Sequence, residues 1–121
     1  MTQPVLSSPW RGRAAQVLTH PSASTVHTGA AHWETLLRAR AVETQSWVIA
    51  AAQVGRHNEK RTSYGRSKVI EPWGRVALCL KGVRDEQGDA EDGAFGDIGV
   101  VQMDLAELDR VRREMPLQRR T

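Results

Sequence analysis

Residues 18–55 alternate between short apolar runs and longer polar or mixed segments. Residues 17–19, Val-Leu-Thr, begin a first strand, and Pro21 ends it because proline has no amide hydrogen to donate to a β-ladder. Residues 47–52, Trp-Val-Ile-Ala-Ala-Ala, form a second apolar run without alternation. Such a run is typical of a strand buried on both faces, although periodicity alone also allows a helix that continues through the alanines.

A helix is predicted between these runs, over residues 30–45. It is rich in strong helix formers, namely Leu36, Leu37, Arg38, Ala39, Arg40 and Ala41. Trp33, Leu36 or Leu37, and Ala41 recur at helical spacing and give one apolar face, which we expect to pack against a sheet. Two strands joined through a loop and a helix form a crossover with parallel pairing, so the sequence predicts an α/β fold.

The middle of the chain predicts a polar loop followed by a hairpin. Residues 54–62 are polar and contain a glycine, which is typical of a solvated loop. Val69 and Ile70 begin a strand that ends before the turn Glu71-Pro72-Trp73-Gly74. Residues 75–81 alternate as the returning strand, and the expected faces are Val76, Leu78 and Leu80 on one side with Ala77 and Cys79 on the other.

The last third predicts a loop, a strand and a helix. Residues 82–96 are acidic and rich in glycine, so we expect a mobile loop. Residues 98–103 are expected to form a short strand. Asp104 begins a helix, with Glu107 as its capping-box partner and Pro116 beyond its end. The expected inner face of this helix is Leu105, Leu108, Val111 and Arg112.

Three ordered motifs give the chain a family resemblance: LTHPSAS, TGAAHWETLLRARAVETQ and WVIAAAQVGRHNEKRTSYGRSKVIEPWG. They resemble the C-terminal half of the nitrilase superfamily of carbon–nitrogen hydrolases, most closely the nitrilase-homologue amidases that act on deaminated glutathione. The resemblance runs from about Pro4 to Thr121. It implies that residues 1–121 are one partial domain, the C-terminal portion of a four-layer α-β-β-α sandwich, in which residues 1–16 match poorly.

The same resemblance implies amide hydrolysis by a glutamate, a lysine and a cysteine, with no cofactor and no metal. Pro4 matches the proline of the family's arginine–phenylalanine–proline–glutamate turn. The family's nucleophilic cysteine lies a few residues before that proline, and its glutamate and lysine lie further upstream. No catalytic residue therefore carries over to this sequence, and we expect a fragment that is inactive by itself. Glu59 and Lys60 are adjacent in a loop and match neither catalytic position.

The segment from Ser22 to Trp33 has the strongest claim to function. By resemblance it lies beside the nucleophile and lines the substrate pocket, which makes Ser22, Ala23, Thr28, His32 and Trp33 the expected substrate-binding residues. Free amides at the start of a helix suit a carboxylate-bearing substrate. The alternative is that Trp33 is simply a core residue and Thr28 simply a helix cap. His20 and Ser24 replace aromatic residues that are common in the family.

The single cysteine and the four histidines have other interpretations. Cys79, with no partner cysteine, excludes an internal disulfide, and its place in an alternating strand favours a packed core thiol over a nucleophile. His20, His27, His32 and His57 lack a cysteine or carboxylate that would complete a tetrahedral set, so surface or capping roles are expected and no metal site is predicted.

Charge and composition narrow the choice of partners. The 17 basic and 14 acidic residues are interspersed, giving a net charge of +3, so a nucleic-acid footprint is not expected. The N-terminus lacks an apolar signal region and no apolar run reaches membrane-spanning length, so we expect a cytoplasmic protein.

By resemblance, the helix over residues 33–45 packs at a dimer interface, which predicts a homo-oligomer whose full-length form acts on a small amide. The rival hypothesis is a non-enzymatic module that docks on a full-length subunit through this helix, and a basic nucleic-acid binder ranks third.

Overall fold

A computed structural model describes residues 15–56, 62–84 and 90–116. Its elements are, in chain order, β1 (Val17–Thr19), α1 (Val26–Thr28), the π-helical η3 (Gly29–Trp33), α2 (Glu34–Thr44), β2 (Trp47–Ala50), β3 (Val54–Arg56), β4 (Thr62–Tyr64), β5 (Lys68–Ile70), β6 (Val76–Cys79), the 3₁₀-helical η4 (Ala94–Gly96) and α3 (Leu105–Glu114). The α/β class predicted from the sequence is confirmed.

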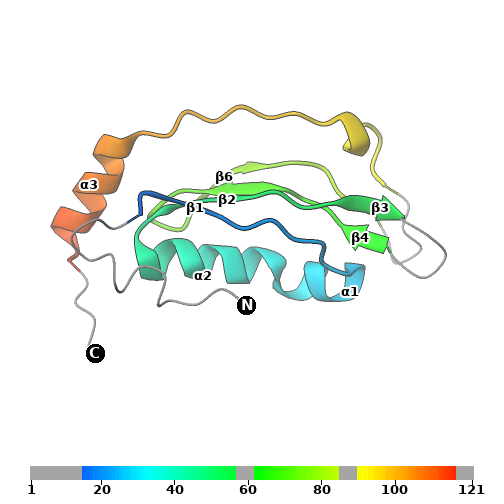
Figure 1. The fold of residues 1–121 in the computed structure, drawn as a ribbon, viewed down its shortest axis with the longest axis horizontal. Helices are drawn as coiled ribbons and strands as arrows, with labels where there is room; N and C mark the ends of the chain where they lie inside the picture. The colour runs from blue at the N-terminus through cyan, green and yellow to red at the C-terminus, as the bar shows by residue number, and fades with distance from the viewer. Residues whose placement is uncertain (1–14, 57–61, 85–89, 117–121) are drawn as a thin grey trace.

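The main sheet has the strand order β1-β2-β5-β6. β1 and β2 are parallel, with Leu18 opposite Val48, whereas β5 runs antiparallel to both of its neighbours, β2 and β6. The predicted crossover through a helix is therefore confirmed. α2 lies along one face of this sheet, and a segment from the C-terminal third passes over the opposite face (Figure 1).

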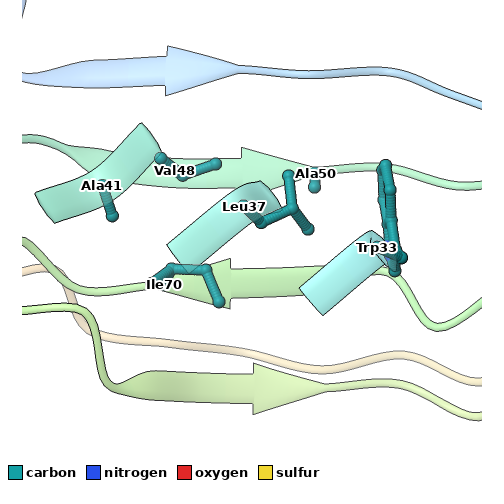
Figure 2. Packing of buried hydrophobic residues seen from close by; sticks show 6 residues of the cluster. All are labelled: Trp33, Leu37, Ala41, Val48, Ala50 and Ile70. Carbon is teal, nitrogen blue, oxygen red and sulfur yellow. The ribbon is translucent and has the colours of Figure 1, made fainter. Parts of the chain in front are cut away.

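The core lies between α2 and the two central strands. Figure 2 shows the side chains of the helical segment pointing at those of β2 and β5, and the cluster consists of Trp33, Leu37, Ala41, Val48, Ala50 and Ile70. Leu37 is 1% exposed and Leu36 is 50% exposed. Leu37 is therefore the leucine on the inner face of α2, which the spacing alone had left open. α2 ends at Gln45, whose left-handed φ of 50° turns the chain into β2, and residues 47–50 are a strand, not a continued helix.

The hairpin of β5 and β6 forms as predicted, but with a bulge. In its turn, the Gly74 amide donates to the Glu71 carbonyl at 2.8 Å. Ile70 pairs with Val76 while Val69 pairs with Leu78, so Ala77 is an extra residue in β6. Val76 therefore packs against the helix-side core and Leu78 lies on the other face. The expectation that both point the same way is wrong, because the bulge resets the alternation.

Two further predictions differ from the structure. Residues 54–56 and 62–64 form the antiparallel pair β3 and β4 instead of a polar loop, and residues 57–61 lie outside the described parts. Residues 98–103 are not a strand, because no described strand pairs with them. In the segment 82–96, Val83 and Ala94 are buried, so its two ends are packed against the protein, while residues 85–89 are not described.

α3 begins at the predicted cap, where the Ala106 amide donates to Asp104 Oδ1 at 2.9 Å. Leu108 and Val111 are buried as expected, but Leu105 is exposed and Glu107 pairs with Arg110. Burial lowers the pKa of Arg112. Its guanidinium fastens α3 to the sheet by donating to the carbonyls of Gln45 at 2.9 Å and Ala15 at 2.7 Å, and to Ser46 Oγ at 3.1 Å.

The two adjacent leucines of α2 allow a matched test of the core. We expect Leu37→Ala to lower the free energy of unfolding by about 2–5 kcal/mol, because it leaves a cavity between α2 and the sheet. Leu36→Ala is expected to change it by less than about 0.5 kcal/mol, because that side chain is half exposed. Urea unfolding followed by circular dichroism measures both, and equal losses would contradict the assignment of the inner face.

Candidate functional site

The loop between β1 and α2 carries the residues predicted to bind substrate, and backbone hydrogen bonds hold it on two sides. The Ser22 amide donates to the Ala51 carbonyl at 3.0 Å, and the Gln53 amide donates to the Ser22 carbonyl at 3.1 Å. On the other side, the Tyr64 amide donates to the Ser24 carbonyl at 2.8 Å. The loop is therefore fixed to the ends of β2 and β4, which is the rigid support that a binding wall requires.

The helical segment after this loop begins at Thr25. Thr25 Oγ1 accepts a hydrogen bond from the Thr28 amide at 3.2 Å and lies 2.7 Å from Thr28 Oγ1. The residue that caps the helix is therefore Thr25, three residues before Thr28, which the alternative interpretation took as the cap. Residues 29–33 then form a π-helical turn before α2, a feature that is frequent at functional sites.

The five predicted site residues do not all face the same environment. Ser22 is half-buried in the loop after β1, and Ala23, Thr28 and His32 are exposed on the loop and the first helical turns. Trp33 is only 4% exposed and belongs to the core, where its Nε1 donates to the Arg66 carbonyl at 3.0 Å. Ser22, Ala23, Thr28 and His32 therefore lie along the segment between β1 and α2. The Trp33 side chain points into the core and supports that segment from the inside.

The sequence did not predict two of the contacts that Trp33 makes. The His20 ring lies 5.9 Å from the Trp33 ring, centroid to centroid. Burial, and secondarily the positive charge of Arg40, lower the pKa of His20, so its neutral form is favoured beside the tryptophan. Arg66 pairs with Glu91 and lies over the Tyr64 ring. Trp33 and Arg66 are 33 residues apart, and no local pattern signals their contact.

Cys79 is exposed, so the expected packed core thiol is wrong. On the face of the main sheet where α2 packs, the helix covers β2 and β5 but leaves β6 uncovered (Figure 2). The Cys79 sulfur accepts a hydrogen bond at 3.1 Å from the ammonium group of Lys68, which is itself buried and lies 3.2 Å from Glu34 Oε1.

The described residues form neither a metal-binding cluster nor a membrane-spanning helix. Within residues 15–56, 62–84 and 90–116, no three His, Cys, Asp or Glu side chains come close enough together to hold a metal ion. His57 falls outside these ranges. In the same part of the chain, no helix has the length and apolar character needed to cross a bilayer.

The matches to known proteins cover nearly the whole chain. Residues 4–113 match the carbon–nitrogen hydrolase family. The chain belongs to that family. This carbon–nitrogen hydrolase chain is 48% identical over 115 residues to the nitrilase and fragile histidine triad fusion protein NitFhit of Caenorhabditis elegans, covering 94% of its own length and 23% of the relative. It is 46% identical over 118 residues to the deaminated glutathione amidase of Homo sapiens, covering 97% of its own length and 32% of the relative.

Solved structures agree with this assignment. The C. elegans NitFhit protein superposes with a TM-score of 0.71 at 46% identity, covering 94% of this chain and 25% of that one. Saccharomyces cerevisiae Nit3, a member of branch 10 of the nitrilase superfamily, superposes with a TM-score of 0.75 at 26% identity, covering 97% and 39%. The predicted family and the predicted α-β-β-α sandwich are confirmed. The carbon–nitrogen hydrolase chain spans between about a quarter and a third of the curated relatives described above.

The loop's support can be tested at Gly29, which packs against Tyr64. A Cβ atom at Gly29 would lie 2.5 Å from the Tyr64 Cβ, whereas nothing lies within 4 Å of one at Gly96. We expect Gly29→Ala to lower the free energy of unfolding by about 1–3 kcal/mol through overpacking, even though alanine has the higher helix propensity.

Gly96→Ala is the matched control and is expected to leave stability within about 0.5 kcal/mol. Thermal or urea unfolding measures both variants. A stabilising Gly29→Ala change would show that the close approach to Tyr64 does not restrain the loop.

Proposed function

We propose that this chain is the C-terminal part of an amidase of the deaminated glutathione type. It supplies the supporting sheet and one wall of the substrate pocket and none of the reacting groups. The observation that carries the proposal is the 46% identity to the human deaminated glutathione amidase across 97% of this chain. The loop of Ser22, Ala23, Thr28 and His32, held between β2 and β4, supports the assignment of that wall.

In the chemistry that the family resemblance implies, a cysteine thiolate attacks the amide carbonyl and a glutamate acts as general base. A lysine stabilises the oxyanion, and water then releases the acyl-enzyme. Those groups belong to the part of the domain outside the matched region. The described chain contributes positioning: hydroxyl and imidazole groups on a loop whose backbone is already hydrogen-bonded, so that little ordering is needed when substrate binds.

A chimera tests this function. Residues 4–121 replace the corresponding segment of the human relative, and hydrolysis of deaminated glutathione is followed by mass spectrometry. We expect the chimera to be active and the chain alone to show no turnover above a denatured control. A folded but inactive chimera, or turnover by the chain alone, would contradict the proposal. A chimera whose nucleophilic cysteine is changed to alanine controls for contaminating activity.

Within the chimera, Thr28→Ala is expected to raise KM roughly 3- to 10-fold through the loss of one hydrogen bond at the pocket wall. Thr35→Ala changes an exposed threonine two elements further on, in α2, and is expected to leave KM unchanged.

The chain's second proposed property is homo-oligomerisation through α2. An apolar surface continues from this helix across the hairpin turn to the end of α3, where Val42, Pro72, Trp73, Val111 and Met115 line a shallow pocket together with Gln45. Trp73 is 61% exposed. Val42 and Met115 are also exposed, whereas Pro72 and Val111 are buried. Exposed apolar side chains gathered at one place are characteristic of protein–protein contacts.

We expect Trp73→Glu to shift the wild-type oligomer toward monomer in sedimentation velocity at micromolar concentration, because a charge would be buried in the contact. Leu105→Glu changes an apolar side chain that is also exposed, but outside this surface, and is expected to leave the mass unchanged. A monomeric wild-type chain that nevertheless co-elutes with a full-length amidase would favour the rival interaction module instead.

A further inference from the structure

Lys68 and Cys79 face one another across the last two strands of the main sheet. They are directly opposite in the register of β5 and β6, and residues directly opposite in a ladder project from the same face of the sheet. That face is the one on which α2 packs, because Ile70, two residues after Lys68, belongs to the core beneath the helix. The Lys68 ammonium group donates to Cys79 Sγ at 3.1 Å. The two side chains therefore connect β6 to its neighbour within the sheet.

The two members of this pair differ in their access to solvent. Lys68 is 5% exposed, which is unusual for a lysine. Its ammonium group lies 3.2 Å from Oε1 of Glu34, in the first turn of α2, and this ion pair holds the amine in place. Cys79 is exposed, because α2 leaves β6 uncovered on this face (Figure 2). A fixed, buried amine thus adjoins a thiol that a small solute can reach.

Oxidation gives this pair a specific chemistry. An oxidised cysteine at the sulfenic acid stage condenses with a second thiol or with a nitrogen atom. Cys79 is the only cysteine among the 121 residues, so the chain offers no second thiol. The Lys68 amine is a nitrogen nucleophile within hydrogen-bond distance of the sulfur. It occupies the position that a resolving cysteine has in other redox-sensitive pairs.

We propose that Lys68 and Cys79 form an oxidative modification site, in which a sulfur–nitrogen bond links β5 to β6. Hydrogen peroxide first transfers one oxygen atom to the Cys79 thiol, which becomes a sulfenic acid, and the peroxide is reduced to water. Lys68 then passes a proton to the Glu34 carboxylate, and the lone pair of its amine attacks the sulfur. The sulfur–oxygen bond breaks, and the departing hydroxide takes a hydrogen from the nitrogen and leaves as water.

The link alters the attachment of α2. The linked nitrogen carries no charge, so Glu34 loses its ion pair with Lys68 and keeps only the weaker contact with Arg38, at 3.9 Å. The modification is also reversible, because an added thiol can attack the sulfur and release the amine. Reversibility distinguishes the link from the sulfinic and sulfonic acids that form when a sulfenic acid is oxidised further.

The experiment exposes the full chain to hydrogen peroxide, removes the excess and determines its mass and its peptides under non-reducing conditions. We expect a species lighter than the untreated chain by two hydrogen atoms, a cross-linked peptide that joins Lys68 to Cys79, and a return to the starting mass after dithiothreitol. An unmodified Cys79 would overturn the proposal. So would a sulfinic acid, a sulfonic acid or a disulfide-linked dimer at Cys79 with Lys68 unlinked.

Lys68→Arg tests the role of the amine, because it keeps a positive charge beside Glu34 but has no primary amine. We expect this variant to form the sulfenic acid without the link, so that dimedone captures the oxidised Cys79. The same loss of two hydrogen atoms in Lys68→Arg would overturn the proposal.

Lys81→Arg is the matched control, because the Lys81 ammonium group donates to the Asp92 carbonyl at 3.0 Å instead. It is expected to form the link as the wild-type chain does. Circular dichroism before oxidation verifies that both arginine variants are folded, and loss of the link in Lys81→Arg would overturn the assignment of the amine to Lys68.

Discussion

The packing of α2 against β2 and β5 is the contact on which the rest of the structure depends. Leu37 and Ala41 fill the space above Val48 and Ile70, and Trp33 closes one end. Because α2 connects β1 to β2, this packing also sets the parallel pairing of those strands and the place where the loop from Ser22 to Thr28 leaves the sheet. The candidate site is thus positioned by apolar burial and presented by backbone hydrogen bonds.

Features governed by local pattern could be predicted from the sequence. Helical spacing placed Trp33 and Ala41 on the inner face of α2 but left the choice between Leu36 and Leu37 open, and proline and glycine located the turn after β5. The predictions that were wrong concerned features that depend on contacts with residues elsewhere in the chain. β3 and β4 are too short and polar for the sequence pattern to predict them as strands, and they form because each pairs with the other. The bulge at Ala77 reversed one side-chain direction, and residues 98–103 form no strand because no described strand pairs with them.

The candidate site divides in the same way. Its loop was found through family resemblance, since no spacing within residues 20–33 specifies a substrate. The neighbours of Trp33 could not be found, because the indole reaches the Arg66 carbonyl across the fold and not along the helix. Cys79 was misjudged because alternation reports which way a side chain points and not whether another layer covers it.

The hydrogen bonds of Arg112 have a consequence for the order in which the chain folds. Its acceptors are 67 and 97 residues away, at Gln45 and Ala15. These carbonyls come together only after β1 and β2 have paired and α2 has turned at Gln45. The hydrogen bonds of Arg112 therefore cannot form until the crossover exists, and contacts of such long sequence separation form slowly. During synthesis, the C-terminal helix is expected to join last, on a scaffold that is already built.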